Sequence, residues 1–192
     1  ATVLELWFER RSIISVEPLT GLHRDTIDSL ILTVGENCQA LMDSIEGVEV
    51  KDVEVDEIWS FVGLKEKKRA VRGYNADEFG DSWTWIAVEA HTKLILAHKT
   101  GGRDADTCWS FLERLRDATV GRFQLSSDGL AAYRLSVPFV MRDRVDFGQL
   151  VKNYASTQTT TRYSPAQIIS AEKKSRFGNP DFKRICTSHV ER

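Results

Sequence analysis

The stretch from Val53 to Gly63 constrains the fold of this chain more than any other part of the sequence. It reads V-E-V-D-E-I-W-S-F-V-G, and its apolar residues recur at every second position, which is the period of a β-strand with one covered face. The apolar positions are Val53, Val55, Trp59 and Phe61. Asp56 lies on the other face, while Glu57 interrupts the apolar one. A buried carboxylate is costly unless it is paired, hydrogen-bonded or bound to a metal. The strand therefore predicts either a structural acid that is hydrogen-bonded or paired with its neighbours, or one ligand of a metal site.

The composition is that of a globular protein with one medium domain, or a core with a small appendage. The chain has 192 residues, of which 42% are hydrophobic and 28% charged. No apolar run approaches the roughly 18 residues that span a bilayer, and the N-terminus lacks the pattern of a signal peptide. We therefore expect no membrane association and a cytoplasmic location.

Three cysteines, Cys38, Cys108 and Cys186, lie far apart in the sequence. Their odd number and their spacing argue against a disulfide framework and against a cysteine-based zinc site, and they suit a reducing cytoplasm. We interpret Cys186 as a small buried hydrophobe.

The charge is distributed unevenly along the chain. Residues 1–50 hold three basic and nine acidic groups, whereas residues 151–192 hold eight basic and three acidic ones. This pattern excludes a globally basic DNA-binding protein, so only local basic patches could contact a phosphate backbone.

Residues 1–47 are predicted to be helical. A first helix covers residues 2–10, and a second is followed by a tight turn at Gly21 and an amphipathic helix in which Ile27, Leu30, Ile31 and Val34 share one stripe. This outline is that of a helix-turn-helix, in which His23, Arg24 and Thr26 would face DNA, or of an ordinary helical hairpin.

A basic loop follows the strand on which Asp56 lies. Its cationic residues are Lys65, Lys67, Lys68, Arg69 and Arg72. The loop is either a solvated hairpin tip or a segment that contacts phosphates.

The next part of the sequence predicts two strands, at residues 83–89 and 94–98, a helix capped by Asp104, and a fourth strand that ends at Asp128. The order is β-β-β-α-β. A crossover of this kind places the fourth strand parallel to the first and beside it. Two carboxylates on neighbouring strands repel each other unless a cation or a proton lies between them, which favours a metal site.

Residues 130–181 show little pattern, and we expect an irregular excursion with one helix. The chain closes with F-K-R-I-C-T-S-H-V-E-R, which predicts the start of a helix carrying Glu191. His189 is interpreted as a hydrogen-bonding or phosphate-facing residue.

Several motifs, taken together, resemble one known family. D-E-I-W-S-F-V-G, S-S-D-G-L-A-A-Y and T-S-H-V-E-R, in that order, are similar to motifs of the bacterial insertion-sequence DDE transposases of the insertion-sequence-one type. The segment T-G-L-H-R-D-T-I resembles the helix-turn-helix that precedes their catalytic core. The likeness covers nearly the whole chain.

The resemblance implies an α/β (α+β) fold, with a ribonuclease-H-like mixed sheet over residues 48–192 preceded by the helical DNA-binding region. It implies three catalytic, metal-binding acids, which by motif are Asp56, Asp128 and Glu191. Such acids hold two divalent ions, Mg²⁺ or Mn²⁺, which suit hard oxygen ligands. The implied reaction is cleavage of DNA at the ends of an insertion sequence and transfer of the strands into target DNA.

The resemblance also implies double-stranded DNA as partner, a homo-oligomer in the active complex and association with the nucleoid. Family members usually extend further in both directions, so the chain is expected to be a fragment whose isolated activity is weak or absent. Two other readings stay open: a non-catalytic DNA-binding remnant or repressor, and another ribonuclease-H-fold nuclease that acts on RNA or hybrids.

Overall fold

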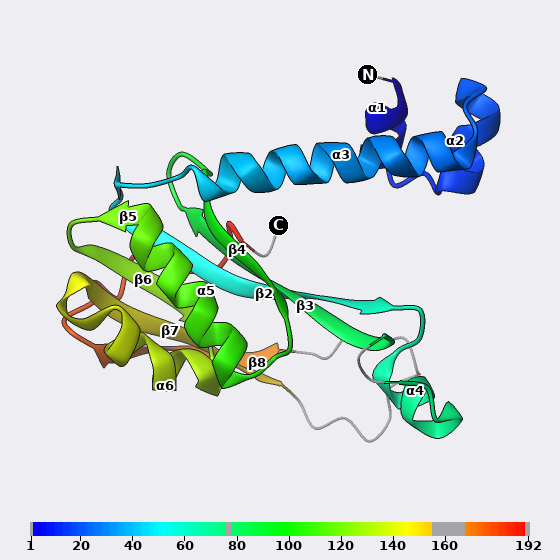
Figure 1. The fold of residues 1–192 in the computed structure, drawn as a ribbon. Coiled ribbons are helices and arrows are strands. Elements are labelled where there is room, and N and C mark those ends of the chain that lie inside the picture. Colours follow the sequence, from blue (N-terminus) through cyan, green and yellow to red (C-terminus); the bar gives the residue numbers. More distant parts are fainter. Residues whose placement is uncertain (1, 76–77, 155–167, 191–192) are drawn as a thin grey trace. The chain divides into compact units, whose positions relative to one another are not determined.

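The computed structural model describes residues 2–75, 78–154 and 168–190, which form two compact units, residues 1–45 and residues 46–192. Figure 1 shows the helices and strands of both. Within the described part of the chain, no helix combines the length and apolar character needed to cross a membrane.

The first unit consists of three helices. They are α1 (Thr2–Phe8), α2 (Ile13–Thr20) and α3 (Arg24–Asp43). Helix α2 ends at Gly21, whose φ of 70° is the left-handed conformation that glycine adopts without strain. Val3, Val16 and Ile27 form the small core of this unit. Helix α3 continues through Gly35, but Leu30 of its predicted apolar stripe is exposed, as is Leu41 further along the helix.

The second unit is built on a six-stranded mixed sheet in the order β4-β3-β2-β6-β7-β8. Strands β2 (Asp52–Val62), β3 (Gly80–Glu89) and β4 (Ile95–Gly101) are antiparallel to their neighbours in this group. Strand β6 (Phe123–Asp128) is parallel to β2, and β7 (Val145–Tyr154) is parallel to β6. The β-β-β-α-β order and the parallel pairing of the fourth strand with the first are as the sequence predicted.

Helices α5 (Ala105–Ala118) and α6 (Ala131–Val140) cover one face of this sheet (Figure 1). Helix α5 begins at Asp104, whose side chain accepts a hydrogen bond from the Thr107 N–H as the predicted N-cap. Its buried face includes Phe111, whereas Trp109 is 42% exposed. Two two-residue strands, β1 (Val48–Glu49) and β5 (Thr119–Val120), form a separate parallel pair.

Strands β2 and β3 extend beyond the covered part of the sheet and form an arm. Helix α4 (Glu66–Arg72) follows β2 at the tip of this arm (Figure 1). The covered face predicted for the whole of β2 is therefore wrong for its second half, because Trp59 and Phe61 are 40% and 44% exposed. The basic segment that the sequence placed in a loop is largely a helix.

The prediction of an irregular excursion after residue 130 is also wrong. This part contains α6, a short 3₁₀ helix (η1, Arg142–Arg144), β7 and the edge strand β8 (Ile168–Phe177). Among the described residues, strand β8 pairs with β7 alone, and most of its side chains are exposed. An edge strand of this kind lacks the apolar alternation by which strands are recognised in a sequence. Residues 155–167 lie outside the described part.

The second face of the sheet contacts the C-terminal segment, which we define as residues 179–190. The side chain of Gln124 on β6 exchanges two hydrogen bonds with the backbone of Asp181, and Arg184 bonds to Asp52 at 3.0 Å. Gly148 on β7 lies so close to Ile185 that a Cβ would approach its Cδ1 within 2.4 Å. Where the sequence predicted the start of a helix, Ser188–Val190 form a turn.

Candidate functional site

Asp56 and Asp128 lie beside each other where the pairing of β2 with β6 ends. The last paired residues are Val55 and Ser127, so the two aspartates occupy the next position on each strand. Because paired residues of parallel strands point to the same face, the structure brings these two predicted acids together. Asp128 is the last residue of β6, and Gly129 follows it.

Hydrogen bonds hold both aspartates in place. Asp56 Oδ1 accepts the N–H of Glu57 at 2.9 Å, and Asp128 Oδ1 accepts the N–H of Leu130 at 2.9 Å. The buried amide of Gln149 donates to the carbonyl of Asp128 at 2.7 Å and to that of Leu130 at 3.1 Å. These contacts fix the turn after β6, and with it the carboxylate at its start.

Glu57 supplies a third carboxylate that the sequence reading did not select. One oxygen from each of Asp56, Glu57 and Asp128 lies within 4.8 Å of the other two. The Glu57 side chain is fully buried, and its Oε1 makes no hydrogen bond within the described residues. Burial and the nearby charge of Asp128 raise the pKa of Glu57, whereas the Tyr133 hydroxyl and Arg103 lower it, and the net result is a pKa of about 6.

Arg103 is the cation of this cluster. Its Nε donates to Glu57 Oε2 at 3.1 Å, and its Nη2 lies 3.8 Å from Asp128 Oδ2. The guanidinium carbon also lies 4.6 Å from the ring centroid of Trp83, a cation–π distance that helps to hold the side chain. Lys152 adds a second basic side chain to the lining of the cavity beside these carboxylates.

A cavity of about 560 Å³ opens beside these acids. Its polar lining comes from Asp56, Arg103, Asp128 and Lys152, and its apolar lining from the start of α6 and from β7. Three hard oxygen donors at this spacing, one of them from the buried side chain of Glu57, suit a cation such as Mg²⁺ or Mn²⁺. These are oxygen donors of the kind that Mg²⁺ and Mn²⁺, the ions implied by the family resemblance, prefer.

Glu191, the third predicted acid, lies outside the described residues. The segment just before it is held on β2, because Glu54 Oε2 accepts the N–H of His189 at 2.8 Å. Glu54 precedes Asp56 by two positions on β2, as His189 precedes Glu191 by two in the sequence.

The predicted DNA-binding residues of the helical unit lie at the start of α3. His23, Arg24 and Thr26 are all exposed. His23 is the N-cap of α3, and its Nδ1 accepts the N–H of Asp25 at 3.3 Å. It therefore has a local structural role in addition to its exposed position.

The predicted basic residues around α4 fall into two groups. Lys67, Lys68 and Arg72 are exposed on the helix. Lys65 lies 4.9 Å from the ring centroid of Trp59, and Arg69 is half-buried and bonded through Nε to Glu66 at 3.0 Å. Arg69 is thus already engaged within the arm.

Glu57 and Arg103 are the site residues that the sequence reading missed. The signal for Glu57 was present, because a carboxylate on the apolar face of a strand must be compensated. Arg103 comes two residues after Gly101, the last residue of β4, and only the antiparallel pairing of β4, β3 and β2 brings it to Glu57.

No family model matches this chain. A search of curated proteins finds the insertion element iso-IS1n protein InsB of Shigella dysenteriae, which is 33% identical over 85 residues. The aligned part is 44% of this chain and 53% of that protein, so the chain spans about half the length of the relative. The similarity supports a relationship to the insertion-sequence transposase family that the sequence motifs resemble.

Proposed function

We propose that this chain carries the catalytic acids of a DDE transposase, which cleaves DNA at the ends of an insertion sequence and transfers the strands to a target. The observation that carries the proposal is the convergence of Asp56, Glu57 and Asp128 beside an open cavity. The β-β-β-α-β order, with acids at the same position of two adjacent parallel strands, supports a ribonuclease-H-like core.

In this proposal, Asp56 and Asp128 hold Mg²⁺ or Mn²⁺ together with Glu191. Two such ions, when bound, stabilise the charge that develops on the phosphodiester and favour deprotonation of the attacking hydroxyl or water. Hydrogen bonds to Glu57 N–H and Leu130 N–H keep one oxygen of each aspartate in a fixed direction. Such preorganised ligands are what in-line phosphoryl transfer requires.

Glu57 and Arg103 adjust the charge of the site. With a pKa raised to about 6, Glu57 exchanges its proton near neutral pH, whereas an ordinary glutamate does not. Before a metal binds, Arg103 offsets part of the negative charge of Glu57 and Asp128. Its guanidinium also lines the cavity where a phosphate would lie.

The DNA partner is proposed to contact the exposed lysines of α4 and the start of α3. The arm presents Lys67, Lys68 and Arg72 on a solvent-exposed helix. An insertion sequence has two ends, so we propose that more than one copy of the chain assembles on them during the reaction.

The experiment is Mg²⁺-dependent cleavage of a plasmid that carries the DNA flanking this gene in its source genome. We expect nicking that is lost in Asp128→Asn and retained in Asp143→Asn, a matched change at an exposed acid of η1. Equal nicking by wild type and Asp128→Asn would contradict the proposal. Metal-independent DNA binding without cleavage would favour a repressor, and preferential cleavage of an RNA–DNA hybrid would favour a different nuclease.

A further inference from the structure

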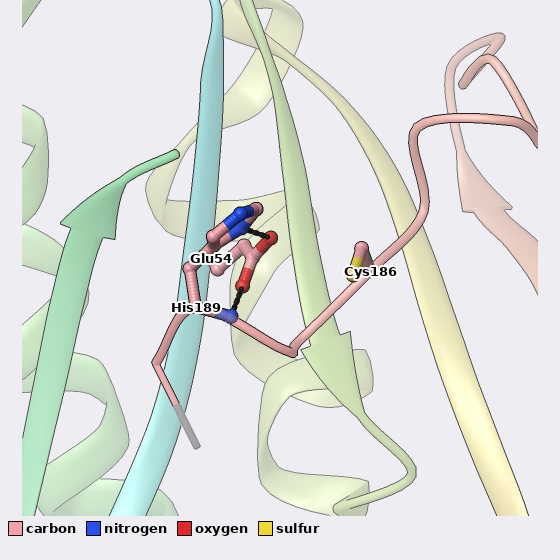
Figure 2. Close-up of side chains that lie close together, drawn as sticks. All are labelled: Glu54, Cys186 and His189. Atoms are coloured by element: carbon pink, nitrogen blue, oxygen red, sulfur yellow. Dashed lines mark hydrogen bonds and ion pairs between the residues drawn. The ribbon is translucent and has the colours of Figure 1, made fainter. Parts of the chain in front are cut away.

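A second group of potential metal ligands lies on the opposite face of the sheet from α5 and α6. Glu54 comes from β2, and Cys186 and His189 come from the C-terminal segment (Figure 2). One ligand atom from each lies within 4.8 Å of the other two. The set combines a carboxylate, a thiol and an imidazole, so its chemistry differs from that of the all-carboxylate cluster at Asp56.

Glu54 gives this group its charge. Its side chain is only 4% exposed, and both of its oxygens face His189: Oε2 accepts the backbone N–H at 2.8 Å, and Oε1 lies 2.7 Å from Nδ1 (Figure 2). A carboxylate buried to this degree requires a positive partner. The imidazole supplies one when it is protonated, and a metal ion bound between the two side chains would supply a stronger one.

The Cys186 sulfur lies beside two polar groups of Ser188. The N–H of Ser188 points to its Sγ at 3.4 Å, and the Ser188 hydroxyl lies 3.0 Å from the same sulfur. Cys108 lies in a different setting, since it is buried in the core, and this burial raises the pKa of its thiol to about 12.

The spacing of the two C-terminal ligands suits a metal. Cys186 and His189 are separated by two residues, and a turn at residues 188–190 brings them to the same side of the chain. Two-residue separations of this kind are common between ligands of structural zinc sites. Thiolate and imidazole ligands select zinc over Mg²⁺, which prefers oxygen.

We propose that Glu54, Cys186 and His189 form a zinc site, with a water molecule as fourth ligand. Zinc takes the place of the proton between Glu54 and His189, and the Cys186 thiol loses its proton as the Zn–S bond forms. The site fastens the C-terminal segment to β2, two residues before Asp56. It does not depend on the proposed function, because a structural zinc would hold this segment in a protein of any activity.

The test uses the reduced 192-residue chain, stripped of metal and then titrated with Zn²⁺ against a chromogenic chelator. Excess Mg²⁺ is present throughout, so that it competes with Zn²⁺ for the carboxylate oxygens around Asp128. We expect one zinc per chain in the wild type, and a loss of affinity of about 100-fold or more in Cys186→Ser and in His189→Ala, beyond what the loss of an outer-shell partner costs. The matched control is Cys38→Ser, because Cys38 is exposed on α3 and belongs to the helical unit.

Two further measurements separate loss of the site from loss of the fold. Co²⁺ in place of Zn²⁺ should give a thiolate charge-transfer band in wild type and Cys38→Ser, and none in Cys186→Ser. Glu54→Gln, which keeps an oxygen for the His189 N–H, should stay folded by circular dichroism and still bind zinc less tightly. Absence of stoichiometric zinc in the wild type, or unchanged affinity in folded Cys186→Ser, would overturn the proposal and leave Glu54 and His189 as a hydrogen-bonded pair only.

Discussion

Arg103 Nε lies 3.1 Å from Glu57 Oε2, and this contact joins the end of the β4 hairpin to the middle of β2. The same guanidinium reaches toward Asp128. Arg103 therefore supplies positive charge to Glu57 and Asp128. Its removal tests how much this charge contributes to the free energy of unfolding.

We predict that Arg103→Gln lowers the free energy of unfolding at pH 8 by about 1–3 kcal/mol in the presence of chelator, because a buried carboxylate loses its charged partner. Millimolar Mg²⁺ should restore part of this loss by binding the uncompensated acids. Denaturant unfolding with and without Mg²⁺ measures both effects. A variant that is as stable as wild type in chelator would show that the pair contributes little.

Glu57→Gln should stabilise the protein at neutral and higher pH. The folded-state pKa of Glu57 is raised to about 6 from 4.5, so the native state holds more protons than the unfolded state between these values. The contribution of Glu57 to stability therefore falls as the pH rises through this window, by about 2 kcal/mol in all. Melting curves should show the variant more stable than wild type at pH 8, with the difference vanishing near pH 4. If Glu57→Gln is more stable than wild type by the same amount at pH 8 and pH 4, the raised pKa of Glu57 is contradicted.

Gly148→Ala should loosen the C-terminal segment, because the new Cβ would meet Ile185 at 2.4 Å. We expect a loss of about 1–3 kcal/mol from overpacking, together with faster hydrogen exchange in residues 179–190. Gly35→Ala is the matched control, since nothing lies within 4 Å of its Cβ position inside α3. That change should be neutral or stabilising by up to about 1 kcal/mol. Unaltered exchange in the Gly148 variant would mean that Ile185 can move aside.

Lys67→Gln combined with Lys68→Gln should weaken DNA binding and make it less sensitive to salt. Log affinity falls with log salt concentration, and each phosphate contact that is lost reduces the magnitude of this slope by about 0.9. Fluorescence anisotropy with duplex DNA at several salt concentrations gives this slope. Lys51→Gln, at the opposite end of β2, should leave it unchanged. If the α4 variant and Lys51→Gln show the same affinity and the same salt slope, α4 makes no specific contribution to DNA binding.

The sequence predicted the first four strands of the sheet and the helix between the third and fourth because each carries a local signal. The alternation around Val53 and Val55 and the N-cap at Asp104 are examples that the structure confirms. The pairing of β2 with β6 followed from connection rules, and it brings Asp56 to Asp128.

Other features depend on contacts between distant residues and leave no local trace. The Glu54–His189 contact joins residues 135 positions apart. Strand β8 pairs at an edge and exposes most of its side chains, so its pattern is that of a polar segment. Trp59 and Phe61 follow the strand alternation, yet both are exposed, because hydrophobic alternation cannot reveal where the covered part of a sheet ends.

The most direct test of the carboxylate site is calorimetric titration of the chain with Mn²⁺ at pH 7.5. Wild type and Asp143→Asn should bind Mn²⁺ with the same affinity, and Asp56→Asn and Asp128→Asn should each weaken binding by about 10-fold or more, because both contribute ligands. Equal Mn²⁺ affinity in wild type and Asp128→Asn would contradict a metal site between β2 and β6.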